Sequence, residues 1–168
     1  VWSERRLIAN EPFAVILPDD VIAAEKPCLQ QMVEAYEETG PAINALISVN
    51  PEALSTAAAM DAARSEGESM GPLHGIPIFL KDNYDTADMP TTAGSDALAG
   101  ALPPDDAFVV QRLRAAGAII LAKANMSEFA ASYGRLGYSS LGGLTLNPYN
   151  LNRDAAGSSS GTAAAIAA

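Results

Sequence analysis

The sequence predicts an α/β fold, and the alternation of two kinds of segment carries that prediction. Apolar runs of strand length occupy residues 76–80 and 118–122, while segments with helix capping signals lie between and after them. Residues 72–131 are therefore interpreted as strand, long loop, helix, strand and helix. This alternation is typical of α/β folds, in which helices cover a sheet.

Two helices are predicted before the first strand. Residues 29–36 carry one apolar stripe, and this helix should end before Gly40; the stripe consists of Leu29, Met32, Val33 and Tyr36. A second helix is expected from Asn50 to Gly67, because Asn50 can cap free amides and Pro51 suits a first turn. Three prolines interrupt the first 27 residues, which receive no assignment.

Two further helices are predicted on either side of the second strand. One should start at Asp105 or Asp106 and close at Gly117, with a shared face formed by Val109, Leu113 and Ala116. The other should begin at Asn125, where a capping acceptor is followed three residues later by Glu128. Both predictions rest on local capping signals.

Composition excludes several classes of function. The 168 residues are 49% hydrophobic and 18% charged, which is enough apolar material for a globular core. A formal net charge of −10 gives none of the basic surface that nucleic acids require, so no nucleic-acid partner is expected. A single cysteine, Cys28, and a single histidine, His74, argue against a disulfide, a metal site or another cofactor.

The hydropathy pattern predicts no membrane partner. No apolar run approaches the roughly 18 residues of a spanning helix, and the first residues lack the pattern of a signal peptide. The chain begins with Val1, which is compatible with a cleaved leader or a truncated reading frame. The compartment is left open, with the cytoplasm slightly favoured.

A cluster of three serines, Ser158-Ser159-Ser160, lies between Gly157 and Gly161, ahead of an alanine-rich segment that should be helical. A loop that leads into a helix N-terminus presents free amides, which favour negative charge and can stabilise an oxyanion. Taken alone, the cluster fits either a catalytic role or a structural role, because serines also cap helices. A phosphate-binding loop is disfavoured, since Thr162 stands where a Walker motif needs lysine.

Lys81 is a candidate general base at the end of the first strand. Neighbouring residues of a strand point to opposite faces, so Lys81 can face inward even though Asp82 follows it. To be neutral, the amine needs a pKa about 3 units below the free value, and a shift of this size costs on the order of 4 kcal/mol. Burial among apolar groups can produce such a shift. Most lysines after a strand are solvated, but a neutral one beside a serine cluster indicates an amide hydrolase.

Several blocks of sequence, in a fixed order, resemble the amidase signature family. The blocks are residues 71–77, 80–83, 89–95, 106–108, 113–118, 123–129 and 147–150, followed by the serine cluster. Because order and spacing are preserved together, this resemblance is far more specific than a lone Gly-Ser motif. It covers roughly residues 28–168, which we expect to form one incomplete domain after the unassigned residues 1–27.

The resemblance implies an α/β/α fold with a mixed central sheet, of which this chain would be the N-terminal portion. It also implies that a carboxamide is hydrolysed to a carboxylate and ammonia or an amine, through a Ser-Ser-Lys triad and an acyl-enzyme, without a cofactor. Lys81 matches the family's catalytic lysine, and Ser158 matches the bridging serine, whose peptide bond is typically cis. In that scheme Lys81 draws a proton through Ser158 from a second serine, which attacks the amide carbonyl.

The chain departs from the family pattern in two ways. Ala156 and Ser160 replace one glycine on each side of the usual serine pair, which leaves open whether Ser158 or Ser159 is the bridging serine. In the family, the acylated serine and the oxyanion loop would follow Ala168, and this chain does not contain them. We therefore expect the full-length protein to be an amidase, and these 168 residues alone to be inactive and prone to aggregate.

Two other functions remain open. Residues 157–161 also satisfy G-x-S-x-G, which would make Ser159 the nucleophile of an α/β-hydrolase-type esterase, although the preceding residues are polar and no histidine follows. Alternatively, the chain belongs to a non-catalytic member or to an amidotransferase subunit. His74, Cys28 and Lys123 are expected to be structural. The substrate is expected to be a small-molecule amide, which the sequence does not specify further. The sequence does not predict the oligomeric state.

Overall fold

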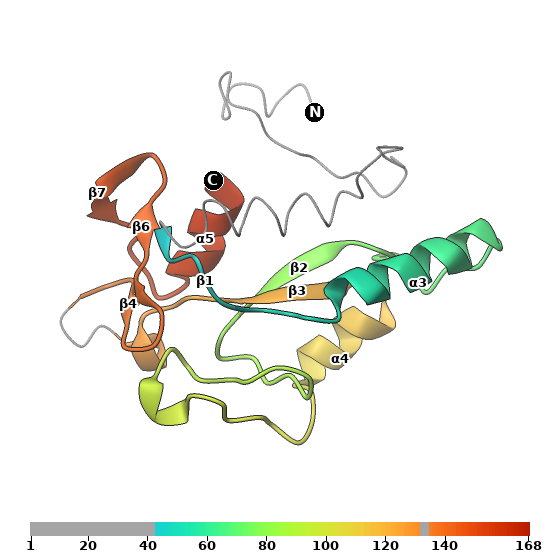
Figure 1. Cartoon of the computed structure of the whole chain (residues 1–168), viewed down its shortest axis with the longest axis horizontal. Coiled ribbons are helices and arrows are strands. Elements are labelled where there is room, and N and C mark those ends of the chain that lie inside the picture. The colour runs from blue at the N-terminus through green and yellow to red at the C-terminus, as the bar shows by residue number, and fades with distance from the viewer. Residues whose placement is uncertain (1–42, 132–134) are drawn as a thin grey trace.

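A three-stranded sheet lies at the centre of the computed structural model, which describes residues 43–131 and 135–168 (Figure 1). Its strands are β1 (Leu46–Val49), β2 (Pro77–Lys81) and β3 (Ile119–Ala124), in the order β1-β3-β2. β2 runs parallel to β3, whereas β1 runs antiparallel to it. The sheet is therefore mixed, as the resemblance implied.

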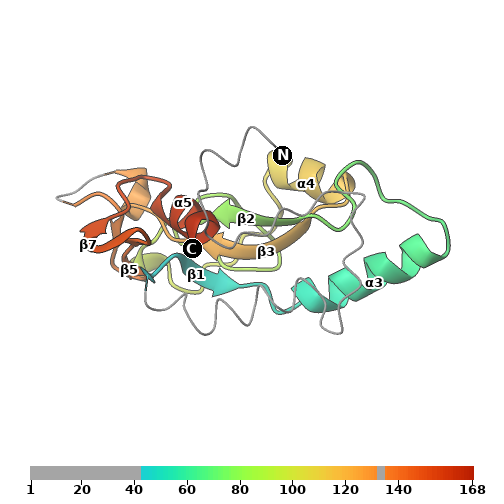
Figure 2. The same ribbon diagram turned by 90° about the horizontal axis from the view of Figure 1, so that it is seen from above.

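Helices cover both faces of this sheet. α3 (Ala53–Ser65) and α4 (Phe108–Ala115) lie on opposite sides of the strands (Figure 2). α5 (Ser160–Ala167) packs Ala164 against Ala122 and Ala124 of β3. α4 packs Val110 against the other face, where it meets Leu80 of β2. The α/β fold class is confirmed, with β3 as the buried central strand.

Short elements occupy the loops between the sheet and the helices. One 3-10 turn, η1 (Asp96–Leu98), lies between β2 and α4, and a second, η2 (Glu128–Ala130), follows β3. Two small antiparallel pairs then follow, β4 (Tyr138–Ser139) with β5 (Gly143–Leu144) and β6 (Leu146–Asn147) with β7 (Asn150–Asp154). The chain returns from β7 directly into the serine cluster. Within the described residues, no helix is long and apolar enough to cross a membrane.

The predicted strands and the second helix are confirmed. β2 includes Lys81 as its last residue, and β3 extends beyond the predicted run to Ala124. The Asn50 side-chain oxygen accepts the N–H of Glu52 at 2.9 Å in the turn before α3, whose N-cap is Glu52, and Gly67 follows the helix with a φ of 83°. The first predicted helix, at residues 29–36, lies outside the described residues.

The predicted start of the third helix is wrong, and its predicted face is correct only in part. α4 begins at Phe108, and Asp106 instead accepts the N–H of Ala87 at 2.8 Å and forms an ion pair with Arg114. Val110 is the buried residue, whereas Val109 is 43% exposed. The start therefore shifts because Asp106 binds the preceding loop. On the inward face Val110 takes the place of Val109, whereas the predicted Leu113 does pack against the core.

The fourth predicted helix is also wrong. Residues 128–130 form a single 3-10 turn, and Phe129 adopts a φ of 51° inside it. The Glu128 carboxylate accepts the N–H of Ser140 at 2.8 Å, and the Asn125 oxygen accepts the N–H of Met126 and the hydroxyl of Ser139. Contacts from later in the chain thus occupy both side chains that were expected to cap a helix.

Candidate active site

Lys81 and Ser158 meet across one face of the sheet. Lys81 ends β2, and Ser158 lies two residues before α5, which packs on that face through Ala164. The Lys81 Nζ and Ser158 Oγ atoms are 2.5 Å apart, although the residues are separated by 77 positions. The fold therefore brings together the two residues that the sequence singled out.

The environment of Lys81 favours a neutral amine. The side chain is partly buried beneath the segment that leads into α5, and burial lowers the pKa of Lys81 from its ordinary value of 10.5. No carboxylate forms an ion pair with Lys81 among residues 43–131 and 135–168, although Asp82 is adjacent in sequence. The neutral form of this amine can accept a proton from the hydroxyl that it contacts.

The backbone at Ser158 is fixed by Ser127. The Gly157–Ser158 peptide bond is cis, and the Ser158 carbonyl accepts the N–H of Ser127 at 3.0 Å. The Ser127 hydroxyl in turn accepts the N–H of Gly137 at 2.8 Å. A Cβ atom at residue 157 would overlap the Ser127 hydroxyl, so only glycine allows this close approach.

The serines do not cap α5 with their side chains. Ser159 occupies the N-cap position without a side-chain capping bond, and Ser160 is buried, with a hydroxyl that finds no partner within the described residues. The start of α5 is held instead by the N–H of Gly161, which donates to the Asn125 carbonyl at 2.9 Å. A purely capping role for the cluster therefore lacks its expected hydrogen bonds.

Asn125 connects four segments around this site. Its amide nitrogen donates to the carbonyls of Asn44, Gly142 and Gly143, at 2.9, 3.2 and 3.2 Å. The prediction used Asn125 as a helix cap and did not consider Ser127 separately. Both lie in the 123–129 block of the resemblance, which was the available signal, but their partners are distant in sequence.

The remaining candidates lie away from the serines. Lys123 pairs in register with Leu80, so its side chain points to the face opposite Lys81. His74 is buried and uses both ring nitrogens, because Nδ1 accepts the N–H of Met70 and Nε2 contacts the Met60 carbonyl, both at 3.0 Å. Cys28 lies outside the described residues.

The local structure does not support a nucleophile elbow at Ser159. The elbow needs a buried strand immediately before the nucleophile. The preceding strand is β7, which is mostly exposed and, within residues 43–131 and 135–168, pairs only with the short β6. The polar residues 150–154 thus form a surface hairpin, and the esterase interpretation is not favoured.

Comparisons with known proteins point to one family. The model of the Amidase family matches residues 28–168. A glutamyl-tRNA(Gln) amidotransferase subunit from Acidothermus cellulolyticus is 44% identical over 153 residues, which is 88% of this chain and 30% of that protein. The corresponding subunit from Thermobifida fusca is 42% identical over 97% of this chain and 32% of its own length.

Comparison with solved structures also finds amide-hydrolysing enzymes. The peptide amidase from Stenotrophomonas maltophilia is 48% identical, with a TM-score of 0.75 over 82% of this chain and 29% of that one. A 6-aminohexanoate cyclic dimer hydrolase is 32% identical, with a TM-score of 0.67 over 82% of this chain and 27% of that one. The chain thus spans about a third or less of the length of these relatives. The family match and these identities show that the chain belongs to the amidase signature family.

Proposed function

We propose that the complete protein hydrolyses carboxamides to a carboxylate and ammonia or an amine, with Lys81 and Ser158 as two members of a Ser-Ser-Lys triad. The observation that carries the proposal is the 2.5 Å contact between Lys81 Nζ and Ser158 Oγ. The direction of the Lys81 pKa shift supports it, because only the neutral amine can act as a base.

In the proposed reaction the proton of the attacking serine passes along the triad and is then delivered to the leaving group. Neutral Lys81 accepts the proton of Ser158 while Ser158 takes the proton of a second serine, whose oxygen attacks the amide carbonyl. The proton returns by the same route to the leaving nitrogen, and an acyl-enzyme remains. Water then attacks the acyl group, so that the carboxylate is released and the serine is restored.

The nucleophile and the oxyanion donors are proposed to lie outside residues 1–168. The family relatives are about three times longer than this chain, which leaves room for both. Residues 28–168 would then be one part of a larger amidase domain, and alone they would be inactive, because loss of oxyanion stabilisation costs orders of magnitude in rate. Of the two serines that the sequence left open, Ser158 is proposed as the bridge, since it contacts Lys81.

A second candidate function is that of the amide-hydrolysing component in an amidotransferase. Relatives with 42–44% identity are named as subunits of glutamyl-tRNA(Gln) amidotransferases. In that case the amide would be that of glutamine, and the ammonia would pass to a second reaction. The same triad would serve both functions, so only the substrate and the partner proteins differ.

The test is an assay of the complete protein that contains this chain. Ammonia release is measured from simple amides, from peptide amides and from glutamine, for the unmodified protein and for Lys81→Ala. Activity of the unmodified protein and its loss in a folded Lys81→Ala variant support the proposal. Arg112→Ala serves as the matched control, because Arg112 is an exposed cation on α4 and should not affect turnover.

The outcomes separate the two candidates. Release from glutamine alone, and only with partner proteins present, favours the amidotransferase function. Release from simple or peptide amides without partners favours an amidase. Full activity in Lys81→Ala would refute the triad in either case.

A further inference from the structure

A fully buried lysine lies on the sheet face opposite the candidate active site. Lys123 belongs to β3 and is 0% exposed. It pairs in register with Leu80, while Ala124 pairs with Lys81, so the two lysines point to opposite faces. Buried lysines are rare and need partners for their charge, which raises the question of what Lys123 does there.

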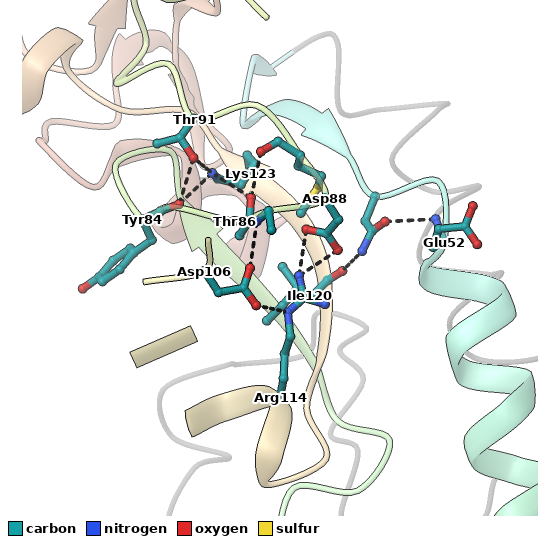
Figure 3. Close-up of polar contacts among 12 residues, drawn as sticks. Glu52, Tyr84, Thr86, Asp88, Thr91, Asp106, Arg114, Ile120 and Lys123 are labelled. Carbon is teal, nitrogen blue, oxygen red and sulfur yellow. Dashed lines mark hydrogen bonds and ion pairs between the residues drawn. The ribbon is translucent and has the colours of Figure 1, made fainter. Parts of the chain in front are cut away.

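Every proton of Lys123 is directed at one loop. Its Nζ donates to the Tyr84 carbonyl and the Thr91 hydroxyl, both at 2.7 Å (Figure 3). It also contacts the Pro90 carbonyl at 3.2 Å and the Thr86 hydroxyl at 3.4 Å. A lysine ammonium has three protons, so these four acceptors are enough to use its full capacity. The loop that they hold begins at residue 82, directly after Lys81.

Asp82 is the anionic counterpart of Lys123. Its Oδ1 lies 3.6 Å from Lys123 Nζ, and both side chains are 0% exposed. Its Oδ2 accepts the N–H groups of Thr92 and Gly94, both at 3.2 Å, and also the Thr92 hydroxyl. The N–H of Asp82 continues the strand pairing to the Ala124 carbonyl at 3.1 Å.

One apolar residue anchors this loop. Between Asp82 and Thr92 the only buried hydrophobic residue is Met89, which packs with Leu80, Val110 and Ile120. The polar contacts of Lys123 and Asp82 add a second set of buried interactions, directly after the end of β2. A buried ion pair is weak evidence for a role in stability, because apolar residues of similar volume often stabilise a protein equally well. A role other than stability is therefore indicated for the Lys123–Asp82 pair.

We propose that the Lys123–Asp82 pair is a positioning pair, which fixes the residue after Lys81 so that the Lys81 amine reaches Ser158 on the other face of the sheet. Without the pair, the end of β2 loses its anchor, and the Lys81 side chain turns toward solvent. The consequence for catalysis rests on the proposed function, whereas the position of Lys81 does not.

The position of Lys81 can be measured without any activity assay. The chain contains three lysines, so acetylation by acetic anhydride at a series of pH values, followed by mass spectrometry of peptides, gives a separate titration for each. The midpoint reports the pKa of Lys81, which burial lowers in the native protein. Each unit by which that pKa rises reduces the neutral fraction about tenfold at a fixed lower pH.

The principal variant is Lys123→Met combined with Asp82→Asn, which removes both charges and leaves no buried ion unpaired. The expected result is a folded protein in which the Lys81 midpoint moves up toward its ordinary value. In the complete protein, kcat is expected to fall at least tenfold with little change in KM, because binding groups are untouched. Thr91→Val is a milder variant, which removes one acceptor of Lys123 and should move the midpoint in the same direction.

Arg114→Met is the matched control. Arg114 ties the same loop to α4 through Asp88 at 2.7 Å but does not contact Asp82 or Lys123. This control should leave the Lys81 midpoint unchanged. A Lys81 midpoint identical to that of the native protein in the folded double variant would overturn the proposal, and if the double variant does not fold, an unchanged midpoint in Thr91→Val would do so.

The two proposals fail in different ways. A shifted Lys81 midpoint in a protein that hydrolyses no amide would support the positioning pair and count against the proposed function. Amide hydrolysis that depends on Lys81 but persists unchanged in the folded double variant would leave the function intact and refute the pair.

Discussion

Ser158 and Lys81 are joined by a 2.5 Å contact between a hydroxyl and an amine, on the sheet face that carries α5. Two consequences of the fold produce it. Lys81 is the last residue of β2, and the backbone of Ser158 is held by the N–H of Ser127. Because each residue is anchored through its own backbone, the contact does not depend on long flexible segments.

The first prediction concerns the pH dependence of activity. The proposed base is the neutral amine of Lys81, and burial lowers its pKa below 10.5. The kcat/KM value should therefore rise with pH along a limb whose midpoint lies below that value. In Lys81→Arg the residual activity should lack this limb, because a guanidinium stays protonated. An unchanged limb in Lys81→Arg would show that another group titrates.

The second prediction concerns stability and follows from the same pKa. The folded-state pKa of Lys81 is lower than that of the unfolded chain, so between these two values the unfolded chain binds more protons and stability rises with pH. Lys81→Met removes this dependence. Its free energy of unfolding should exceed that of the unmodified protein most at pH values below the folded-state pKa of Lys81, and the gain should shrink as the pH approaches the ordinary lysine value.

Urea unfolding of the complete protein, with and without the substitution, at several pH values measures this gain. Arg112→Met is the control for removal of a cation, because Arg112 is exposed on α4 and should show no comparable trend. A gain that grows with pH would contradict the expected sign.

Local patterns predicted the elements that position Lys81 and Ser158. The apolar runs before Lys81 and around residue 120 form β2 and β3. A strand that is buried in a sheet has such a run regardless of which elements pack against it. The Asn50 signal located the start of α3 for a similar reason, since its oxygen accepts an N–H two residues away, although the N-cap itself is Glu52. Sequence could recover these features because their causes are local.

Features with distant causes were missed. Asn125 resembles a helix cap, but carbonyls from residues 44, 142 and 143 engage its amide, and no local pattern reveals them. Lys123 looked like a generic residue after a strand, although it lies in the strand with its ammonium enclosed by the loop after Lys81. The pairing of Lys81 with Ser158 was itself predicted only through resemblance, since spacing alone does not connect positions so far apart.

The third prediction concerns Asn125. Asn125→Asp replaces the donating amide with a carboxylate oxygen that faces three carbonyls in a buried position. Lost hydrogen bonds and an unpaired buried charge should together reduce the free energy of unfolding by about 3 kcal/mol or more. Asn152→Asp is the control, because Asn152 is exposed on β7 and should change stability by less than about 0.5 kcal/mol. Equal effects of the two substitutions would contradict the role of Asn125 as a junction.

The fourth prediction concerns Gly161, in the first turn of α5. A Cβ atom there would overlap the carbonyl of Ala45 and the backbone nitrogen and oxygen of Asn125, none of which can move without shifting β1 or the end of β3. Alanine favours a helix over glycine by about 1 kcal/mol, so propensity alone predicts that Gly161→Ala stabilises. Overlap with three backbone atoms should outweigh this gain and displace α5, and Ser158 with it.

Gly100→Ala provides the contrast that isolates the overlap. Gly100 has a φ of 77°, but a Cβ atom there meets nothing within 4 Å, so its substitution introduces only backbone strain of about 1–2 kcal/mol. Gly161→Ala should destabilise the chain more than Gly100→Ala, and only Gly161→Ala should raise the acetylation midpoint of Lys81, because Ser158 no longer covers the amine. The opposite outcome would be a stable Gly161→Ala protein in which the Lys81 midpoint is unchanged. It would mean that α5 tolerates the displacement. It would also mean that the close contact of α5 with β1 and Asn125 does not set the Lys81–Ser158 geometry.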